Sequence, residues 1–383
     1  MTKIVKPHLL VLYDHFYPAY KAGGPIQSLT NLVLSLQNKY RISVISSAFD
    51  LNEKKVLTGI EPNRWTEVSL PQSTTPVQVW YADPNAPKNT SLKELVKQAD
   101  PSVIYLNGMF SYRFVILPLR LIKNRRLVIC PRGMLQKGAL AGKSFKKKIY
   151  LSLLKMSGLV KHVVWHATNE EEKNDIMRIF GRHAKVIIAG NIPKKPVGEI
   201  NIPEKRLHDL KLVYLSLISE KKNLLQLINT VSGMSENTRL DIYGPVKDEQ
   251  YWSKCREAIN KSNGKVIYKG TVLPEKVQEL FGEYHASVLL TKGENFGHAL
   301  YESLSAGRPV ITSFFTPWQH LEDKKAGWNL DISKDAMVID GMKRIYDLPE
   351  QSYREFCMGA YELAREYYEQ ASGAGSYIEL FSE

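Results

Sequence analysis

The 383-residue sequence contains only three cysteines, Cys130, Cys255 and Cys357, and no C-x-x-C pair. This scarcity excludes a disulfide framework and a cysteine zinc site, and it fits a reducing compartment. The sequence also lacks any run of roughly 20 apolar residues, which a membrane-spanning helix needs. Its first apolar run is too short for a secretory signal and is typical of a first strand. We therefore expect a cytoplasmic protein whose contact with a membrane is peripheral.

Several nucleotide-binding and catalytic signatures are missing as well. The absence of G-x-G-x-x-G and of G-x-x-x-x-G-K-[ST] argues against a dinucleotide dehydrogenase and a P-loop enzyme. No G-x-S-x-G indicates a hydrolase elbow. There is no D-x-D through which a metal could hold a diphosphate. We therefore expect a site without metal and a protein without a resident cofactor.

Acidic residues are outnumbered by basic ones, 39 against 52, which gives a formal net charge of +13. This balance favours polyanionic partners: nucleic acid, anionic lipid headgroups or phosphorylated small molecules. The longest basic cluster, Lys143 to Lys148, is either a solvated helix face or a patch for an anionic membrane. Because no aromatic residues interleave a basic motif, we do not expect nucleic acid as a partner.

Short apolar runs alternate with amphipathic stretches along most of the chain, which predicts parallel sheets with helices on both faces. The expected strands are 8–14, 41–47, 102–107, 127–130, 162–168, 184–190, 211–218, 239–244, 265–270, 286–291 and 309–313. The expected helices are 26–37, 91–99, 114–123, 169–181, 223–233, 249–260, 274–285, 298–306 and 352–370. Three prolines and a glycine in 191–206 predict a linker between two α/β halves. Ligands of such sheets bind outside the carboxyl ends of the strands, so we expect the functional residues in the loops there.

The first candidate loop is KAGGPIQSL at 21–29, where Gly23 and Gly24 precede a helix with Pro25 near its start. Proline is pre-set for a first turn, and glycines let the backbone approach a ligand closely. Unpaired N–H groups at a helix start attract anions. The alternative interpretation is an ordinary tight turn before a helix.

The second candidate loop is SLISEKKNL at 216–224, after the first strand of the second half. Lys221 and Lys222 stand beside a new helix, where a phosphate would meet both the helix dipole and a fixed cation. The alternative is a surface loop with two solvated lysines.

The third candidate is GENFGHALYESLSAGRPVITS at 293–313, which predicts a loop, a helix from about His298 and a further strand. Glu294 lies in the loop and Glu302 about one turn into the helix, and carboxylates accept hydrogen bonds from sugar hydroxyls. Free N–H groups near Phe296 and Gly297 would hold a phosphate or sugar oxygen. The alternative is that Glu302 merely interacts with the helix start.

Taken together, these motifs resemble the family 4 retaining glycosyltransferases, which have the GT-B fold. The resemblance extends over about residues 8–330, and its most specific part is the E-x7-E pattern of Glu294 and Glu302. It implies that Glu294 contacts the donor sugar and Glu302 the ribose, and that Lys222 binds the donor diphosphate. It adds Gly23 and Gly24, Asn295, Phe296 and Gly297 to the donor-binding residues.

On the acceptor side, LNGMFS at 106–111 and PRGML at 131–135 resemble family segments. The resemblance implies Asn107 as a catalytic residue beside Lys222 and Glu294, and it makes Arg132 and Gly133 acceptor-side candidates. Asn107 stands where many members have histidine, and an amide can hydrogen-bond a sugar but cannot act as a base. Leu217 stands where the family usually has an arginine, which removes one cation facing the departing diphosphate. Lys221 could substitute without the bidentate geometry of arginine.

The resemblance implies α/β architecture of the GT-B type, with two Rossmann-like doubly wound parallel-sheet domains facing across a cleft. We expect an acceptor domain over 1–192, with a C-terminal helix at 366–383 packing back on it, and a donor domain over 205–365. The expected activity is retaining, metal-independent hexosyl transfer from a UDP- or GDP-linked sugar to a glycan or lipid-linked saccharide. Family members of this type commonly build capsule, lipopolysaccharide or exopolysaccharide, and the acceptor would be held at the inner face of the cytoplasmic membrane. The alternatives are a weakened sugar-nucleotide-binding or glycan-binding pseudo-glycosyltransferase and a GT-B sugar-nucleotide epimerase.

Overall fold

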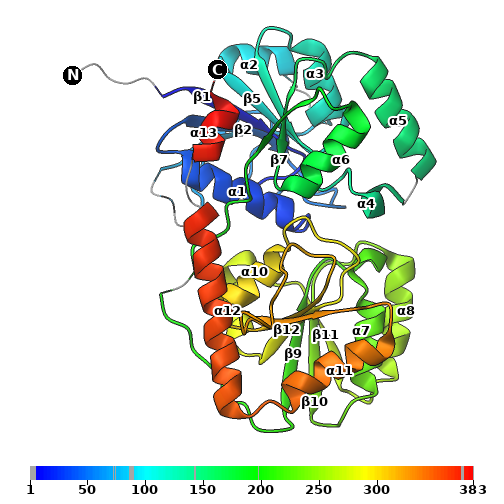
Figure 1. Ribbon diagram of the computed structural model, residues 1–383. Helices are drawn as coiled ribbons and strands as arrows, with labels where there is room; N and C mark the ends of the chain where they lie inside the picture. Colours follow the sequence, from blue (N-terminus) through cyan, green and yellow to red (C-terminus); the bar gives the residue numbers. More distant parts are fainter. Residues whose placement is uncertain are drawn as a thin grey trace. The chain divides into compact units, whose positions relative to one another are not determined.

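In the computed structural model the chain forms two compact units (Figure 1). The first comprises Met1–Ile192 and Ala371–Glu383, and the second comprises Pro193–Gln370. The structure describes residues 6–71, 73, 75–85, 90–141, 144–196, 198–371 and 375–382.

The first unit is built on an eight-stranded sheet in the order β3-β4-β2-β1-β5-β6-β7-β8. Neighbouring strands are parallel except for β3, which is antiparallel to β4. The strands are β1 (His8–Leu12), β2 (Arg41–Ser47), β3 (Trp65–Val68), β4 (Val77–Ala82), β5 (Val103–Asn107), β6 (Arg126–Cys130), β7 (Val164–Ala167) and β8 (Lys185–Ile188). The helices are α1 (Gly24–Leu36), α2 (Leu92–Ala99), a π-helical turn (Tyr112–Ile116), α3 (Leu117–Leu121), α4 (Lys137–Ala141), α5 (Ser144–Met156), α6 (Glu170–Phe180) and α13 (Gly375–Phe381).

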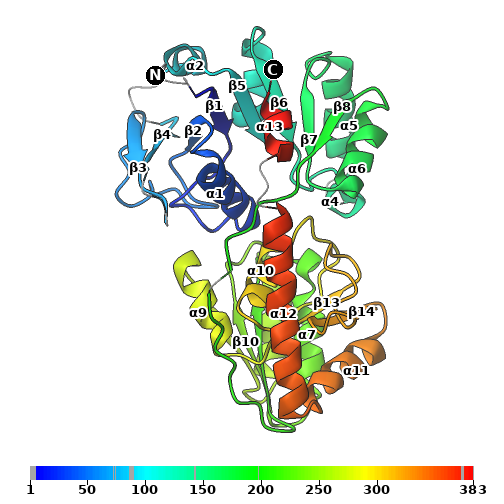
Figure 2. The same ribbon diagram turned by 60° about the vertical axis from the view of Figure 1, so that its left-hand side comes forward.

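Helices cover both faces of this sheet, as the two views in Figures 1 and 2 show. Leu9 and Val11 of β1 pack in one apolar cluster with residues of α1 and α13. Leu10 and Leu12 pack in the other, with residues of α2, α3, α5 and α6. Successive side chains of a strand point to opposite faces, so a strand that is buried throughout feeds both cores.

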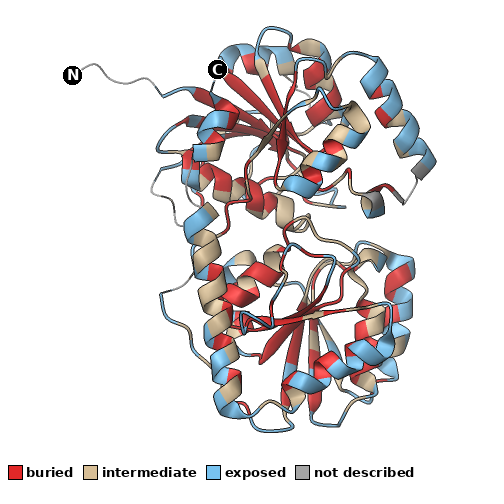
Figure 3. Cartoon of the chain, viewed as in Figure 1, coloured by how far each residue is buried: buried red, intermediate tan, exposed pale blue. Residues whose placement is uncertain are grey.

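The second unit has a six-stranded parallel sheet in the order β11-β10-β9-β12-β13-β14. The strands are β9 (Leu210–Leu215), β10 (Thr238–Tyr243), β11 (Val266–Gly270), β12 (Ala286–Leu289), β13 (Val310–Ser313) and β14 (Gly327–Leu330). The helices are a 3₁₀ turn (Glu220–Lys222), α7 (Leu224–Ser232), α8 (Glu249–Asn260), a 3₁₀ turn (Pro274–Lys276), α9 (Val277–Gly282), α10 (His298–Ser305), α11 (Asp335–Tyr346) and α12 (Glu350–Ala371). In Figure 3 the strands of this sheet are largely buried, whereas the outer sides of its helices are exposed.

The predicted α/β fold is confirmed, with three corrections to its elements. The first sheet is not wholly parallel, because the short edge strand β3 runs antiparallel to β4. Neither β3 nor β4 was predicted, and β14, α4, α5 and α11 were missed as well. The helices expected at 114–123 and 274–285 are replaced by a π-helical turn leading into α3 and by a 3₁₀ turn leading into α9. Pro118 lies just after the π-helical turn, where its missing N–H interrupts the regular α-helical hydrogen-bond pattern.

Specific contacts show where the second unit begins and where the C-terminal segment packs. Tyr301 donates its hydroxyl to the Lys194 carbonyl at 2.8 Å, and Arg308 donates to the Asn201 carbonyl, so the second unit begins before 205. At the C-terminus, α12 ends at Ala371 and α13 is a separate helix, in place of the single helix expected at 366–383. Tyr377, Leu380 and Phe381 of α13 belong to the core of the first unit. Glu383 lies outside the described residues.

Candidate functional site

The loops after β9 and β12 leave the second sheet at the place where its strand order reverses. These two strands are neighbours, and β10 and β11 lie on one side of the pair while β13 and β14 lie on the other. Connections to opposite sides diverge here and leave a crevice at the carboxyl ends of the strands, the usual ligand site of an open parallel sheet. Two of the loops singled out from the sequence meet at this point.

Lys222 and Glu294 form an ion pair between these loops. Their side chains are only 17% and 10% exposed, so water screens the pair weakly. A lysine ammonium has three donors and a carboxylate several acceptor positions, so both groups keep capacity for a ligand while paired. The backbone fixes the pair, because Glu294 donates its N–H to the Phe315 carbonyl at 2.8 Å and Lys292 donates to the Lys221 carbonyl at 2.8 Å.

Two more lysines, Lys221 and Lys247, lie near this pair. Lys221 lies close enough to Glu294, Lys222 and Lys247 to interact electrostatically with all three. Burial lowers the pKa of Lys221, and the neighbouring Glu294 carboxylate opposes that shift. Lys247 follows β10 and is exposed. The carboxyl edge therefore presents three lysines around one carboxylate, a net positive charge suited to a diphosphate.

The position of the usual family arginine is occupied by Leu217, which brings no cation to this edge. Its carbonyl accepts a hydrogen bond from the Tyr214 hydroxyl at 3.3 Å. Lys221 and Lys247 supply positive charge nearby, although neither has the planar fork of an arginine. Sequence inspection did not single out Lys247, and the signal available was a lysine soon after the end of a buried strand.

The 293–297 loop leads into α10 through two glycines with positive φ, 156° at Gly293 and 80° at Gly297. Gly297 is the N-cap residue, and a glycine has no side chain with which to cap α10. The first N–H groups of a helix have no partner within it, so this helix start is able to bind an anion. Glu302 lies half-buried in the second turn of α10, and Asn295 is half-buried in the loop.

Phe296 is placed differently from the other predicted donor residues. Its side chain is 5% exposed and packs against Trp318, Tyr301 and Tyr367, and its carbonyl accepts a hydrogen bond from Trp318 Nε1 at 2.6 Å. Its ring anchors the loop to the core and does not face the strand-end site. Any contact of Phe296 with a donor would come from its backbone.

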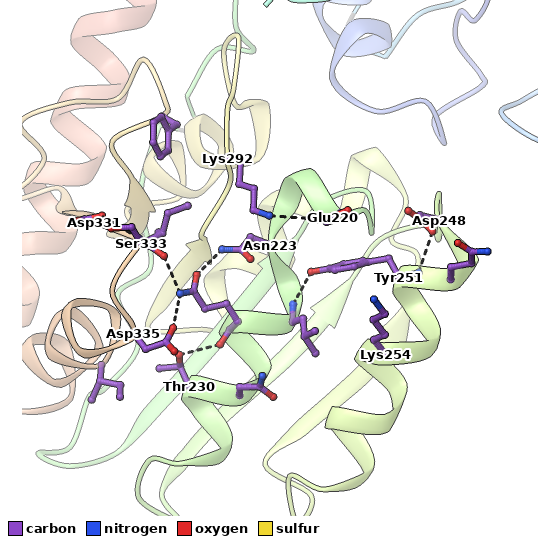
Figure 4. A pocket seen from close by; sticks show the side chains of 17 residues that line it. Glu220, Asn223, Thr230, Asp248, Tyr251, Lys254, Lys292, Asp331, Ser333 and Asp335 are labelled. Carbon is purple, nitrogen blue, oxygen red and sulfur yellow. Dashed lines mark hydrogen bonds and ion pairs between the residues drawn. The ribbon is translucent and has the colours of Figure 1, made fainter. Parts of the chain in front are cut away.

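A pocket of about 980 Å³ lies beside this site, along α7 and α8 (Figure 4). Glu220, Asn223, Lys292 and Phe315 line it on the side nearest the two loops, whereas Lys222 and Glu294 do not line it. The other lining residues are Leu225, Gln226, Asn229, Thr230, Asp248, Gln250, Tyr251, Lys254, Asp331, Ile332, Ser333, Asp335 and Ile339. Its four carboxylates outnumber its two lysines, so it suits a diphosphate less well than the edge next to it.

In the first unit, Gly23 is the N-cap residue of α1 with φ 74°, and Gly24 and Pro25 are the first two helical residues. A glycine has no side chain with which to cap this helix. The preceding turn is held by the buried Asp50 carboxylate, which accepts hydrogen bonds from the N–H groups of Tyr20 and Lys21 at 3.0–3.2 Å. The glycine loop therefore has a fixed shape and leads into a helix whose N-cap residue has no capping side chain.

Asn107, Arg132 and Gly133 come together in the first unit, but inside it. Arg132 is 9% exposed and donates to the Asn107 Oδ1 at 3.0 Å, to the Asn191 Oδ1 at 2.8 Å and to the Tyr105 hydroxyl at 3.1 Å. Asn107 is fully buried. The N–H of Gly133 donates to the buried Glu172 carboxylate at 2.6 Å. These groups already have hydrogen-bond partners inside the unit, so their roles as direct contacts to an acceptor or sugar remain predictions.

This buried network continues through His166. The Tyr105 hydroxyl lies 2.7 Å from His166 Nδ1. His166 Nε2 lies 2.7 Å from the Ala189 carbonyl oxygen, and because a carbonyl only accepts, Nε2 is the donor of that hydrogen bond. Burial, together with the nearby Arg132 charge, lowers the pKa of His166 to about 3, so it is neutral at neutral pH. The network joins β5, β6 and β7 to the segment that leaves the unit at Asn191.

Asp14 is a functional candidate that sequence inspection did not single out. It follows β1 and accepts a hydrogen bond from Ser111 Oγ, after β5, at 2.8 Å. Strands β1 and β5 are neighbours at the point where the first sheet reverses its strand order. Burial raises the pKa of the Asp14 carboxyl. The available signal was a polar residue directly after a fully buried strand.

Among the described residues, no group of three or more histidine, cysteine, aspartate or glutamate side chains is arranged to hold a metal ion. None of the helices in the described part of the chain is long and apolar enough to cross a bilayer.

The second unit matches a known protein family. A model described as "Glycosyl transferases group 1" matches residues 199–361. The match covers most of the second unit and less than half of the chain, and we call the matched region the group 1 domain. Its matched region contains all the strand-end loops described for that unit, including Lys222 and Glu294. No curated protein matches the sequence.

Solved structures show that the whole chain has the GT-B fold of glycosyltransferases. The sucrose-phosphate synthase of Thermosynechococcus elongatus superposes with a TM-score of 0.76 at 15% identity, covering 98% of this chain and 100% of that one. Anabaena HepE, solved with UDP and glucose, gives 0.74 at 14% identity, with 99% and 100% covered. WaaG, a glycosyltransferase involved in lipopolysaccharide biosynthesis, gives 0.66 at 12% identity, with 97% and 98% covered.

Within this glycosyl transferase domain, the predicted donor residues come from two loops separated in sequence. The structure brings Lys222 and Glu294 into contact and places Gly297 at the start of the helix that carries Glu302. Gly23 and Gly24 lie in the first unit, at the start of α1. The domain therefore holds its own compact cation and carboxylate cluster.

Proposed function

We propose that this protein is a retaining, metal-independent glycosyltransferase that uses a UDP- or GDP-linked hexose. The observation that carries the proposal is the Lys222–Glu294 ion pair at the strand-order reversal of the group 1 domain. The neighbouring lysines provide charge for a diphosphate, and the start of α10, with glycine at its N-cap, would provide N–H groups. Glu294 and Glu302 provide acceptors for sugar and ribose hydroxyls.

The charge balance at this edge also suggests how transfer proceeds. When the bond between the sugar and the diphosphate breaks, negative charge grows on the leaving oxygen. Lys222, with Lys221 and Lys247 nearby, would stabilise that charge more in the transition state than in the ground state. No carboxylate stands out as a covalent nucleophile, so we propose front-face attack, with the donor phosphate taking the acceptor's proton.

For the acceptor, we propose a glycan or lipid-linked saccharide of cell-surface polysaccharide biosynthesis. WaaG, described as acting in lipopolysaccharide biosynthesis, shares the fold, which supports this class of acceptor. Asp14 and Ser111 lie at the carboxyl edge of the first sheet, where an acceptor hydroxyl could bond to the carboxylate. We propose Asn107 and Arg132 as positioning residues for that edge.

The proposal is tested by incubating the protein with UDP- and GDP-linked hexoses and a panel of saccharide acceptors. UDP-glucose is the first donor to test, because HepE was solved with UDP and glucose. We expect release of the nucleoside diphosphate, unchanged by EDTA, and a product with the donor's anomeric configuration by NMR. Inversion of that configuration would refute retention, and loss of activity in EDTA would refute metal independence.

Leu217 favours a second candidate, a pseudo-glycosyltransferase that binds the donor but turns it over weakly. The same panel separates the two, because a binding protein would be stabilised thermally by a nucleotide sugar without releasing nucleotide. Replacing Leu217 with arginine gives a further test. A rise in turnover would show that the missing cation limits the native protein, and an isomerised nucleotide sugar would instead indicate an epimerase.

A further inference from the structure

Helix α5 is apolar on two opposite faces. Leu151 and Leu154 are buried in the core of the first unit. Four other apolar side chains of the helix point into solvent, with exposures of 74% for Phe145, 43% for Ile149, 59% for Leu153 and 81% for Met156. Their spacing of four, four and three residues puts them in one stripe along the helix. Figure 3 shows the outer side of α5 as exposed.

The basic charge of the protein is concentrated in the same part of the chain. Residues 101–169 contain 13 lysines and arginines and no aspartate or glutamate, so they account for the entire formal net charge of +13. On α5 the exposed lysines are Lys146, Lys148 and Lys155, which lie to either side of the apolar stripe at helical spacing. Lys143, the first residue of the predicted basic cluster, lies outside the described residues. We call the four apolar residues and these three lysines the α5 surface.

The α5 surface adjoins the loop after β5. Phe110 and Tyr112 of that region are 36% and 60% exposed. The Phe110 and Tyr150 rings are 5.4 Å apart, and the Tyr150 hydroxyl donates to the Met109 carbonyl at 2.5 Å. The surface is therefore fixed to the strand-end edge at which Ser111 meets Asp14.

We propose that the α5 surface binds an anionic lipid bilayer, with the helix lying in the plane of the interface. The apolar stripe would enter the boundary between headgroups and acyl chains, and the lysines would meet the headgroup phosphates. A soluble polyanion would satisfy the lysines and leave the apolar stripe in water. A bilayer satisfies both, because it is anionic at its surface and apolar beneath. This binding does not depend on the proposed transfer reaction, but it would bring a lipid-held acceptor to the edge beside α5.

The experiment is vesicle flotation of the full-length protein, with phosphatidylcholine alone or mixed with phosphatidylglycerol. We expect flotation with the mixed vesicles and little with phosphatidylcholine. The double variant Leu153→Gln/Met156→Gln should not float, and neutralising Lys146 and Lys148 with glutamine should weaken binding by about fivefold for each lysine. The matched control is Met358→Gln/Lys254→Gln in the second unit, where Met358 is 54% exposed. It should float like the unaltered protein.

Because the altered side chains are exposed, the melting temperatures should stay unchanged, which separates lost binding from lost folding. The proposal is overturned if the unaltered protein stays at the bottom of the gradient, or if the α5 variants float as well as the control. It is also overturned if sedimentation shows a dimer that Leu153→Gln/Met156→Gln dissociates, since the stripe would then bind a second copy. Activity on a soluble acceptor, measured in parallel, tests the transfer reaction separately from membrane binding.

Discussion

At the scale of single residues, the lysine and glutamate that join two loops of the group 1 domain carry the proposed chemistry. We predict that Lys222→Ala lowers kcat/KM for a nucleotide-sugar donor by about 10²–10³-fold, because it removes a cation facing the leaving diphosphate. Lys222→Arg keeps the positive charge, so its kcat/KM should fall less than that of Lys222→Ala. Initial-rate kinetics of nucleoside diphosphate release measure both effects.

Lys254→Ala is the matched control for that prediction. Lys254 is an exposed lysine that lines the neighbouring pocket, so its removal changes the net charge equally without touching the pair. Its kinetics should match those of the unaltered protein. Equal losses in the two variants would mean that general charge, and not Lys222, binds the donor.

Arg132 is a residue whose predicted acceptor role and observed contacts differ. We predict that Arg132→Met lowers the free energy of unfolding by about 2–4 kcal/mol, because Asn107, Asn191 and Tyr105 lose a buried donor. Denaturant unfolding measures this, with the exposed Arg120→Met as control. If stability held while the KM for the acceptor rose, Arg132 would be an acceptor contact and not a structural one.

At the scale of secondary-structure elements, the turn after β10 depends on a glycine. Gly244 has φ 142°, and a side chain there would collide with the Ser216 carbonyl in the turn after β9. We predict that Gly244→Ala costs at least about 2 kcal/mol of stability and weakens donor binding, because the two turns must separate. Thermal melting with and without UDP measures both effects.

The control for that substitution is Gly282→Ala at the end of α9. An added Cβ at Gly282 meets nothing within 4 Å, and its φ is not positive. Its stability and response to UDP should remain close to those of the unaltered protein. A Gly244→Ala variant that behaved the same way would show that the two turns can separate without consequence.

At the scale of the whole molecule, buried histidines set the response to acid. Burial lowers the pKa of His166 to about 3 and that of His285 to about 4, and it also lowers the pKa of His8. The unfolded chain therefore binds more protons than the folded one below pH 6.5. Stability should be full above pH 6.5 and fall by about 1.4 kcal/mol per pH unit for each group as the pH drops towards the folded-state pKa.

Chemical denaturation at a series of pH values between 7 and 4 measures this loss. The raised pKa of Asp14 acts in the opposite direction, so the useful quantity is the difference between variants. His285→Gln should make the acid-induced fall shallower, whereas His183→Gln, on the surface, should leave it unchanged. Parallel curves for His285→Gln and the unaltered protein would contradict the assignment of His285 as a neutral buried group.

Much of the fold could be predicted because it depends on local patterns. Buried parallel strands appear in the sequence as apolar runs. Gly297 indicated the start of a helix, and the prolines of 191–206 indicated a linker. The strand β3 was not predicted because it is only four residues long, is partly buried and lacks a clear apolar pattern. The strand β4 is buried at every residue but Gln78, so its omission was an oversight that its apolar sequence does not explain. The opposite orientation of β3 depends on pairing with β4, which no local pattern encodes.

The α/β class, most of the helices and strands, and the strand-end loops proposed to bind the donor can all be predicted from the sequence. Which of the side chains in those loops meet depends on the tertiary structure. Lys222 and Glu294 are far apart in the chain and pair because β9 lies beside β12. Asn107 and Arg132 turn inward and α5 keeps an apolar stripe outside, because burial depends on which faces the packed elements cover. Local periodicity specifies an element, whereas strand order and packing specify its neighbours.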